Sequence, residues 1–144
     1  MAAAAAGLVV LLGYLGGLAH EVTQPAAPPD FLPVASWLEA HHLQYGLGGY
    51  WESSIITVET GGQVKVRALL KSTMGRDLWL AKPSWYDPAS QQADFIVLSS
   101  MPGYRNWEPR ALIAKYFGRP AREYHFGPYT VMVWDRNLLL SIPG

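Results

Sequence analysis

The chain has 144 residues, a formal net charge of zero and no cysteine. A neutral chain gives no electrostatic case for binding nucleic acid or an anionic membrane surface. The absence of cysteine excludes disulfides and thiolate chemistry and argues against a structural zinc site. About 115 residues follow the apolar N-terminus, the size of one domain with one core.

Residues 1–20 are predicted to form a transmembrane helix. Ala2 to Ala19 carry no charge, and at ~1.5 Å per residue they would span ~27 Å, enough for a bilayer core. Their apolarity rests on seven Leu and Val residues that contribute only about −2 to −4 kcal/mol to insertion. Gly13 and Gly17 are four apart, a spacing that lets other transmembrane helices approach closely, although it can also arise by chance.

Two other interpretations of this segment stay open. A signal peptide would need a positively charged start, but the first Lys or Arg is Lys65; Gly17-Leu18-Ala19 could still serve as a cleavage site. Alternatively, Met1 is an internal start and the segment is the last membrane helix of a longer chain. The lack of basic residues beside the helix predicts a cell-membrane protein whose soluble domain is extracytoplasmic.

Residues 21–30 are predicted to be a proline-rich tether, and residues 31–144 the extracytoplasmic domain. Pro25 to Pro29 would make the tether stiff and extended. A helix is predicted from Phe31 to about His42, capped by Asp30, with Pro33 in its first turn.

The region from Leu43 to Leu69 has two interpretations. Leu43–Leu47 is predicted to be a short strand, Gly48-Gly49 a turn, and Gln63–Leu69 a strand. The β-branched residues within Trp51–Thr60 favour a hairpin with the next strand. A helix over the same residues would instead give a strand-helix-strand unit with a parallel strand pair.

The rest of the chain alternates turns with apolar segments. Leu78–Leu80 could form a short element, Pro83–Pro88 is predicted to be a turn, and Met101–Asn106 a loop. Ala93–Ser99 is typical of a central strand. A helix is predicted over Trp107–Phe117, then a hairpin of Arg122–Phe126 and Tyr129–Trp134. Asn137–Leu140 is expected to dock on the core. The predicted fold is therefore α/β, a small three-layer Rossmann-like domain with a C-terminal β-hairpin, preceded by one transmembrane helix.

Aromatic residues are the most suggestive candidates for binding. Aromatic faces stack on sugar rings as well as filling cores. Trp37, Trp51 and Trp134 lie in periodic segments and are expected in the core. Four others lie in or beside loops and are predicted to contact a glycan or lipid-linked sugar, or to pack on the membrane surface or neighbouring loops: Trp85, Tyr86, Tyr104 and Trp107.

A weaker candidate is a phosphate site at Gly46, Gly48 and Gly49. A glycine turn between a strand and a helix can present backbone N–H groups to phosphate. The full dinucleotide fingerprint is absent, however, and a simple turn requirement explains the glycines equally well.

Metal and hydrolytic chemistry are not expected. His41 and His42 are adjacent and point in different directions on a helix, so with Glu39 and the distant His125 they lack metal-ligand spacing. No metal site and no cofactor are predicted. A glycosidase needs two facing carboxylates, and the sequence brings no two of its candidates together: Glu52, Asp77, Asp87, Asp94 and Asp135.

Short motifs along the whole chain resemble a known family. They are Trp37-Leu38, His42, Tyr45-Gly-Leu-Gly-Gly-Tyr-Trp51, Val64-Lys-Val-Arg67, Ser84-Trp-Tyr-Asp-Pro88, Phe95-Ile-Val-Leu98, Phe117-Gly-Arg-Pro-Ala121 and Tyr129-Thr-Val-Met-Val-Trp-Asp135. Their order and spacing resemble the C-terminal extracytoplasmic tail, with the last membrane helix, of actinobacterial membrane glycosyltransferases of the GT-C, dolichyl-phosphate-mannose protein mannosyltransferase-like type.

The resemblance implies an α/β tail, a helix at Trp51–Thr60, and polyprenyl-phosphate-sugar donors used outside the cytoplasm. It carries over no catalytic residue, because the family's catalytic acids lie in loops between early membrane helices. The expected function is an accessory domain, structural or binding an acceptor or glycan, with catalysis elsewhere in the parent protein. The alternatives are a free-standing membrane-anchored or secreted cell-envelope binding module and, third, an independent enzyme.

Overall fold

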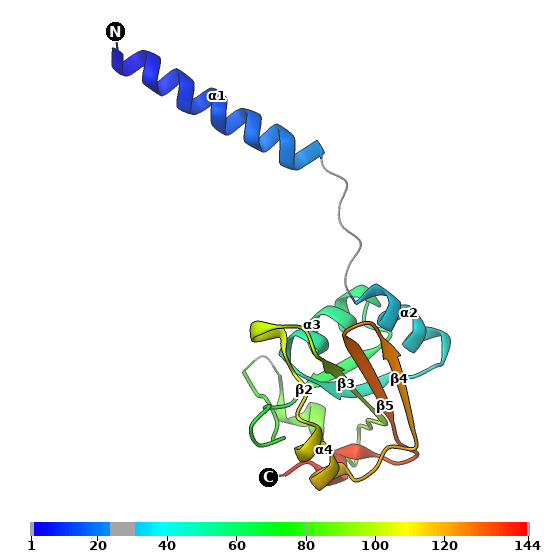
Figure 1. Cartoon of the computed structure of the whole chain (residues 1–144). Helices are drawn as coiled ribbons and strands as arrows, with labels where there is room; N and C mark the ends of the chain where they lie inside the picture. Colours follow the sequence, from blue (N-terminus) through cyan, green and yellow to red (C-terminus); the bar gives the residue numbers. More distant parts are fainter. Residues whose placement is uncertain (1, 24–30, 80, 144) are drawn as a thin grey trace.

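The computed structural model describes residues 2–23, 31–79 and 81–143 (Figure 1). Helix α1 (Ala2–Thr23) runs three residues beyond the predicted end at residue 20. In its last turn, the Thr23 hydroxyl donates a shared hydrogen bond to the backbone carbonyls of Ala19 and His20, each 2.9 Å away. The segment Ala6–Thr23 is long and apolar enough to cross a membrane.

Two predictions about the N-terminal region stay predictions. Residues 24–30 of the proline-rich tether lie outside the described residues. Within the described chain, nothing approaches within 4 Å of the positions that side chains on Gly13 or Gly17 would occupy. Packing of these glycines against other helices is therefore untested.

The domain is built on a five-stranded sheet of order β2-β1-β3-β5-β4. Strand β1 (Tyr45–Gly48) pairs in parallel with β2 (Lys65–Ala68) and β3 (Phe95–Ser99). Strands β4 (Arg122–Phe126) and β5 (Tyr129–Val133) form the predicted antiparallel hairpin, and β5 pairs with β3. The α/β prediction is confirmed.

Helix α3 (Tyr50–Glu59) settles the ambiguity at Trp51–Thr60 in favour of a helix. The β-branched residues of this segment favour a strand locally, but they form a helix because the segment connects two parallel strands. The helix also buries Ile56 completely against the sheet. Strand β1 begins at Tyr45 rather than Leu43, and Gly48, predicted to be in the turn, is its last residue.

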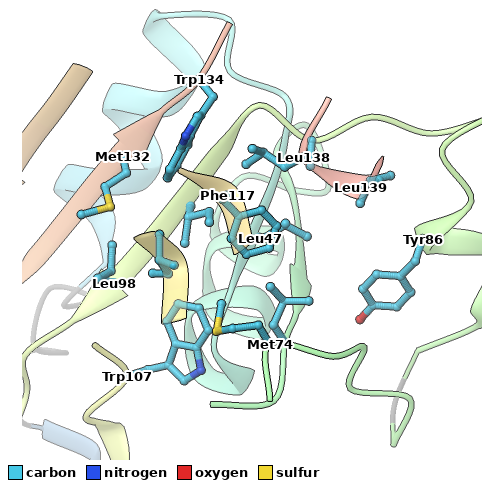
Figure 2. Close-up of a cluster of buried hydrophobic side chains, with 14 residues drawn as sticks. Leu47, Met74, Tyr86, Leu98, Trp107, Phe117, Met132, Trp134, Leu138 and Leu139 are labelled. Atoms are coloured by element: carbon cyan, nitrogen blue, oxygen red, sulfur yellow. The ribbon is translucent and has the colours of Figure 1, made fainter. Parts of the chain in front are cut away.

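The sheet is covered on both faces, which gives three layers. Helices α2 (Leu32–Ala40) and α3 lie on one face, where Phe31, Leu38 and Ile56 are fully or almost fully buried. Helix α4 (Arg110–Phe117) and the 3₁₀ turn Leu138–Ser141 cover the other face (Figure 2). The expected docking of the C-terminal leucines is confirmed, since Leu138 and Leu139 are buried.

Helix α4 starts three residues later than the predicted position at Trp107. Trp107 instead pairs with Ser99 at the end of β3, and each backbone N–H donates to the other's carbonyl at 2.8–2.9 Å. Extending the sheet edge holds Trp107 in a non-helical conformation, so the helix cannot begin until the chain has passed Pro109.

The strand order places the two neighbours of β1 on opposite sides of it. The chain runs from β1 to β2 on one side and then returns to β3 on the other. In open α/β sheets, ligands bind outside the carboxyl ends of the strands at such a switch point. This edge carries the start of α3 and the 3₁₀ turn Gly103–Arg105.

Candidate functional site

A row of four aromatic rings lies along the carboxyl edge of the parallel strands. Trp79 lies 5.8 Å from Tyr50, Tyr50 lies 5.2 Å from Trp51, and Trp51 lies 5.6 Å from Tyr104, measured between ring centroids. Trp79 and Tyr104 at the two ends are about four-fifths exposed, and Trp51 is 38% exposed. We call Trp79, Tyr50, Trp51 and Tyr104 the aromatic row.

The row leads into a pocket of about 300 Å³ between α3 and β2. Tyr50 belongs to both the row and the pocket wall, and Trp85 also lines the pocket. The polar groups of the other lining side chains are three hydroxyls, one carboxylate and one guanidinium. The other lining residues are Ser53, Ser54, Thr57, Val58, Val66, Arg67, Ala68, Asp77 and Ala81.

Arg67 supplies the cation of this pocket. Its guanidinium lies 4.5 Å from the centroid of the Trp85 ring, a cation–π contact. Within the part of the chain that the structure describes, Arg67 makes no salt bridge. Burial lowers the pKa of Arg67, although a guanidinium remains charged at any physiological pH. Its N–H donors are therefore available for a ligand's oxygen atoms.

One wall of the pocket is formed by Asp77, Ala81 and Trp85, which follow β2 in the chain, and Tyr86 fastens this wall to the sheet. The Tyr86 hydroxyl donates to the carbonyl of Ala68 at 2.6 Å and lies 3.2 Å from the carbonyl of Asp77. Its ring is 3% exposed, and burial raises the pKa of Tyr86 to about 12. Tyr86 therefore positions the wall and does not offer its ring to a ligand.

Replacing Tyr86 by phenylalanine should lower the free energy of unfolding by about 1–2 kcal/mol, because a buried hydrogen bond is lost while the ring is kept. Urea unfolding of the full chain in detergent micelles would measure this change. Tyr104→Phe, at an exposed ring, is the matched control and should change the stability little. Equal stabilities of the Tyr86 variant and the wild type would contradict this role of the hydroxyl.

The glycine turn does not present an empty phosphate site. Gly46 lies beneath the Phe95 ring, Gly48 ends β1, and Gly49 precedes the first turn of α3. A side chain at Gly49 would collide with the Glu52 carboxylate and the Trp107 ring. Close packing therefore accounts for the three glycines, rather than the turn requirement considered from the sequence, since none of them has a positive φ.

Glu52 is an almost completely buried carboxylate at the third position of α3. It is 1% exposed, and its Oε1 has no hydrogen-bond partner within the described residues. Burial raises the pKa of Glu52 to about 7, opposed by nearby backbone N–H groups, by the charge of Arg105 and by the Ser99 side chain. It lies outside the pocket lining, so it bears on stability rather than on ligand contact.

Asp77 and Asp87 are each engaged in local turn contacts. Asp77 is the single carboxylate among the pocket's described lining residues, and its Oδ1 accepts a hydrogen bond from the Trp79 backbone at 3.1 Å. Asp87 caps the turn that follows Tyr86 by accepting hydrogen bonds from the Ala89 backbone N–H and the Ser90 hydroxyl at 3.0 Å. Among the residues described, no three His, Asp or Glu side chains form a cluster that could hold a metal.

The structure divides the four predicted aromatic contacts into two pairs. Trp85 and Tyr104 are exposed beside the pocket and at the end of the row. Tyr86 and Trp107 are core residues (Figure 2), so the expectation that they are loop aromatics open to a ligand is wrong. Trp51, expected in the core, belongs to the row instead, while Trp134 is buried as expected.

Sequence reasoning also missed Tyr50, Trp79 and Arg67. The adjacent pair Tyr50-Trp51 could have indicated an exposed ring, because neighbouring residues on a helix point about 100° apart. At most one of the two rings can therefore face the sheet, and the other must lie at its edge or in solvent. Here Glu52 and Ser53 turn inward and the two rings remain at the edge.

Comparisons with known proteins identify no relative: no family model matches the chain, and neither the curated proteins nor the solved structures contain a match.

Proposed function

We propose that this protein is a membrane-tethered, extracytoplasmic sugar-binding domain that serves a glycosyltransferase of the kind its motifs resemble. The observation that carries the proposal is the aromatic row leading into a pocket that holds Arg67, which makes no salt bridge among the described residues. Aromatic faces stack on the apolar faces of sugar rings, while hydroxyls and a guanidinium satisfy the sugar's oxygen atoms.

The pocket also has the dimensions and composition of a small-ligand site. A volume of about 300 Å³ lies at the lower end of the range for ligand pockets, which have mostly apolar walls and a few polar groups. Sugar binding accounts for the features found together: Tyr50 and Trp85 as walls, three hydroxyls, Arg67 and Asp77.

The N-terminal segment supports the membrane-tethered, extracytoplasmic location in this proposal. Helix α1 is long and apolar enough to span a bilayer, and no Lys or Arg precedes Lys65. Because cytoplasmic flanks are enriched in Lys and Arg, this pattern favours an extracytoplasmic domain. The accessory role rests on the family resemblance, with catalysis assigned to other parts of a parent protein.

The binding test uses the full chain in detergent micelles, titrated with polyprenyl-phosphate mannose and with a panel of neutral oligosaccharides. Isothermal titration calorimetry reports binding, because this readout does not depend on Trp85, which lines the pocket and is replaced in one variant. We expect saturable binding of at least one probe, and loss of a stacking ring in Trp85→Ala should weaken it about tenfold, equivalent to roughly 1.4 kcal/mol.

Arg67→Leu provides a second test of the same pocket. It should weaken binding of the same probe, whereas Arg119→Leu, at an exposed arginine beyond α4, should leave it unchanged. Binding that survives both pocket variants at full strength would place the sugar elsewhere, and no binding of any probe would reject the proposal.

A further inference from the structure

We infer that the aromatic row is a membrane-docking surface whose occupant is the interfacial headgroup region of the bilayer that α1 crosses. This inference goes beyond sugar binding and does not depend on it. Trp and Tyr combine an apolar ring with a polar tip, and they concentrate at the membrane–water interface for that reason.

The row has the composition that this location requires. Trp79 and Tyr104 are 79% and 81% exposed, and the neighbouring Leu78 is 47% exposed. A soluble surface rarely presents such rings side by side, and contiguous exposed apolar groups mark a contact with a partner or a membrane. The four rings touch in sequence, so they form one surface.

The attachment point of the tether lies at the same edge of the domain. Phe31, the first described residue after the tether, packs on Tyr129 with 4.2 Å between ring centroids. Tyr129 pairs with Ser99, the last residue of β3. The Arg105 guanidinium lies 5.7 Å from the centroid of the Phe31 ring, and Arg105 directly follows Tyr104 of the row.

The tether limits how far this edge can lie from the membrane helix. Eight peptide steps separate Thr23 from Phe31, and a fully extended chain covers at most about 3.6 Å per step, or roughly 29 Å. Phe31 is 1% exposed, so the chain leaves the domain from a fixed point. Because the tether is short and attached at the aromatic edge, we expect this edge, rather than the opposite one, to face the bilayer.

Docking would also place the pocket at the membrane surface, because Tyr50 belongs to both the row and the pocket wall. A ligand whose sugar projects from the bilayer would then reach the pocket more readily than one diffusing in solution. The binding energy would come from aromatic rings rather than from charge, so docking should be insensitive to salt.

The absence of cysteine from the chain permits a clean test by single labelling. Pro102→Cys places a thiol on an exposed loop residue immediately before the turn that carries Tyr104, and it keeps all four rings. Asp135→Cys is the matched control, at an exposed residue after β5, whose end lies at the opposite edge of the sheet (Figure 1). Each full-length variant carries an environment-sensitive fluorophore and is reconstituted in nanodiscs of phosphatidylcholine brominated on its acyl chains.

We expect several-fold stronger quenching of the label at position 102 than at position 135, unchanged between low and high salt. Adding Trp79→Ser, a change at an exposed ring, should reduce the quenching at position 102 at least twofold. Equal quenching at the two positions, no quenching at position 102, or no effect of Trp79→Ser would overturn the inference. Sugar binding is measured in micelles without brominated lipid, so either proposal can fail while the other holds.

Discussion

Replacing Glu52 by glutamine should make the free energy of unfolding of this domain fall less between pH 5 and pH 8 than it does in the wild type. Burial raises the pKa of Glu52 in the folded chain to about 7 from an ordinary value of 4.5. Between these two values the folded chain holds a proton that the unfolded chain releases. The free energy of unfolding therefore falls as pH rises through this window, by about 2–3 kcal/mol in total.

The direction of this effect is opposite to that of a carboxylate in a salt bridge. A carboxyl group with a lowered pKa stabilises the folded state above its unfolded pKa, whereas Glu52 stabilises it least once it is ionised. The glutamine variant has no proton to lose, so it should be more stable than the wild type at pH 8, and the difference should shrink at pH 5.

Urea unfolding of the full chain in micelles at both pH values measures this difference. Glu59→Gln is the matched control, because Glu59 is an exposed residue at the end of the same helix. It should keep the wild-type dependence on pH. A glutamine variant at position 52 whose stability still falls by the wild-type amount would assign the dependence to another group.

Replacing Gly46 by alanine should destabilise the domain by about 3 kcal/mol or more. Gly46 pairs with Phe95 in the middle of the sheet, and a methyl group at Gly46 would overlap the Phe95 ring. That ring is completely buried, so it cannot move aside into solvent. Strand β1 is only four residues long and has little pairing with which to absorb a displacement.

A double variant tests whether the collision with Phe95 is the cause. Phe95→Leu alone should also destabilise, because it leaves a gap in the core. Together with Gly46→Ala it should cost clearly less than the sum of the two single changes, since the alanine methyl fills part of that gap. Simple additivity in urea unfolding would contradict this account.

The fold was largely predictable because strand and helix periodicity are local properties of the sequence. The apolar run of β3, the hairpin β4–β5 and the helix ending at Gly118 follow from residue patterns and turn residues alone. The exceptions are boundaries set by distant partners: Trp107 pairs with Ser99 and delays α4, and the β-branched residues of α3 are helical because they connect two parallel strands.

The candidate site was only half predictable, because exposure of an aromatic ring depends on what the fold puts over it. Trp85 and Tyr86 are adjacent in a predicted turn, yet one lines the pocket and the other is buried with its hydroxyl on β2. Trp51 and Trp79 are 28 positions apart and enter the same row through Tyr50. No local pattern encodes contacts of this kind.

Composition and short-range periodicity are enough to predict the apolar N-terminal helix, the absence of thiol chemistry and the α/β class. The folded chain is needed to see that Glu52 is buried, that Arg67 stacks on Trp85, and that four rings form a row beside the tether's attachment point. Those features join segments far apart in the chain, and burial and ring contacts exist only once the strands have paired and the helices have packed on the sheet.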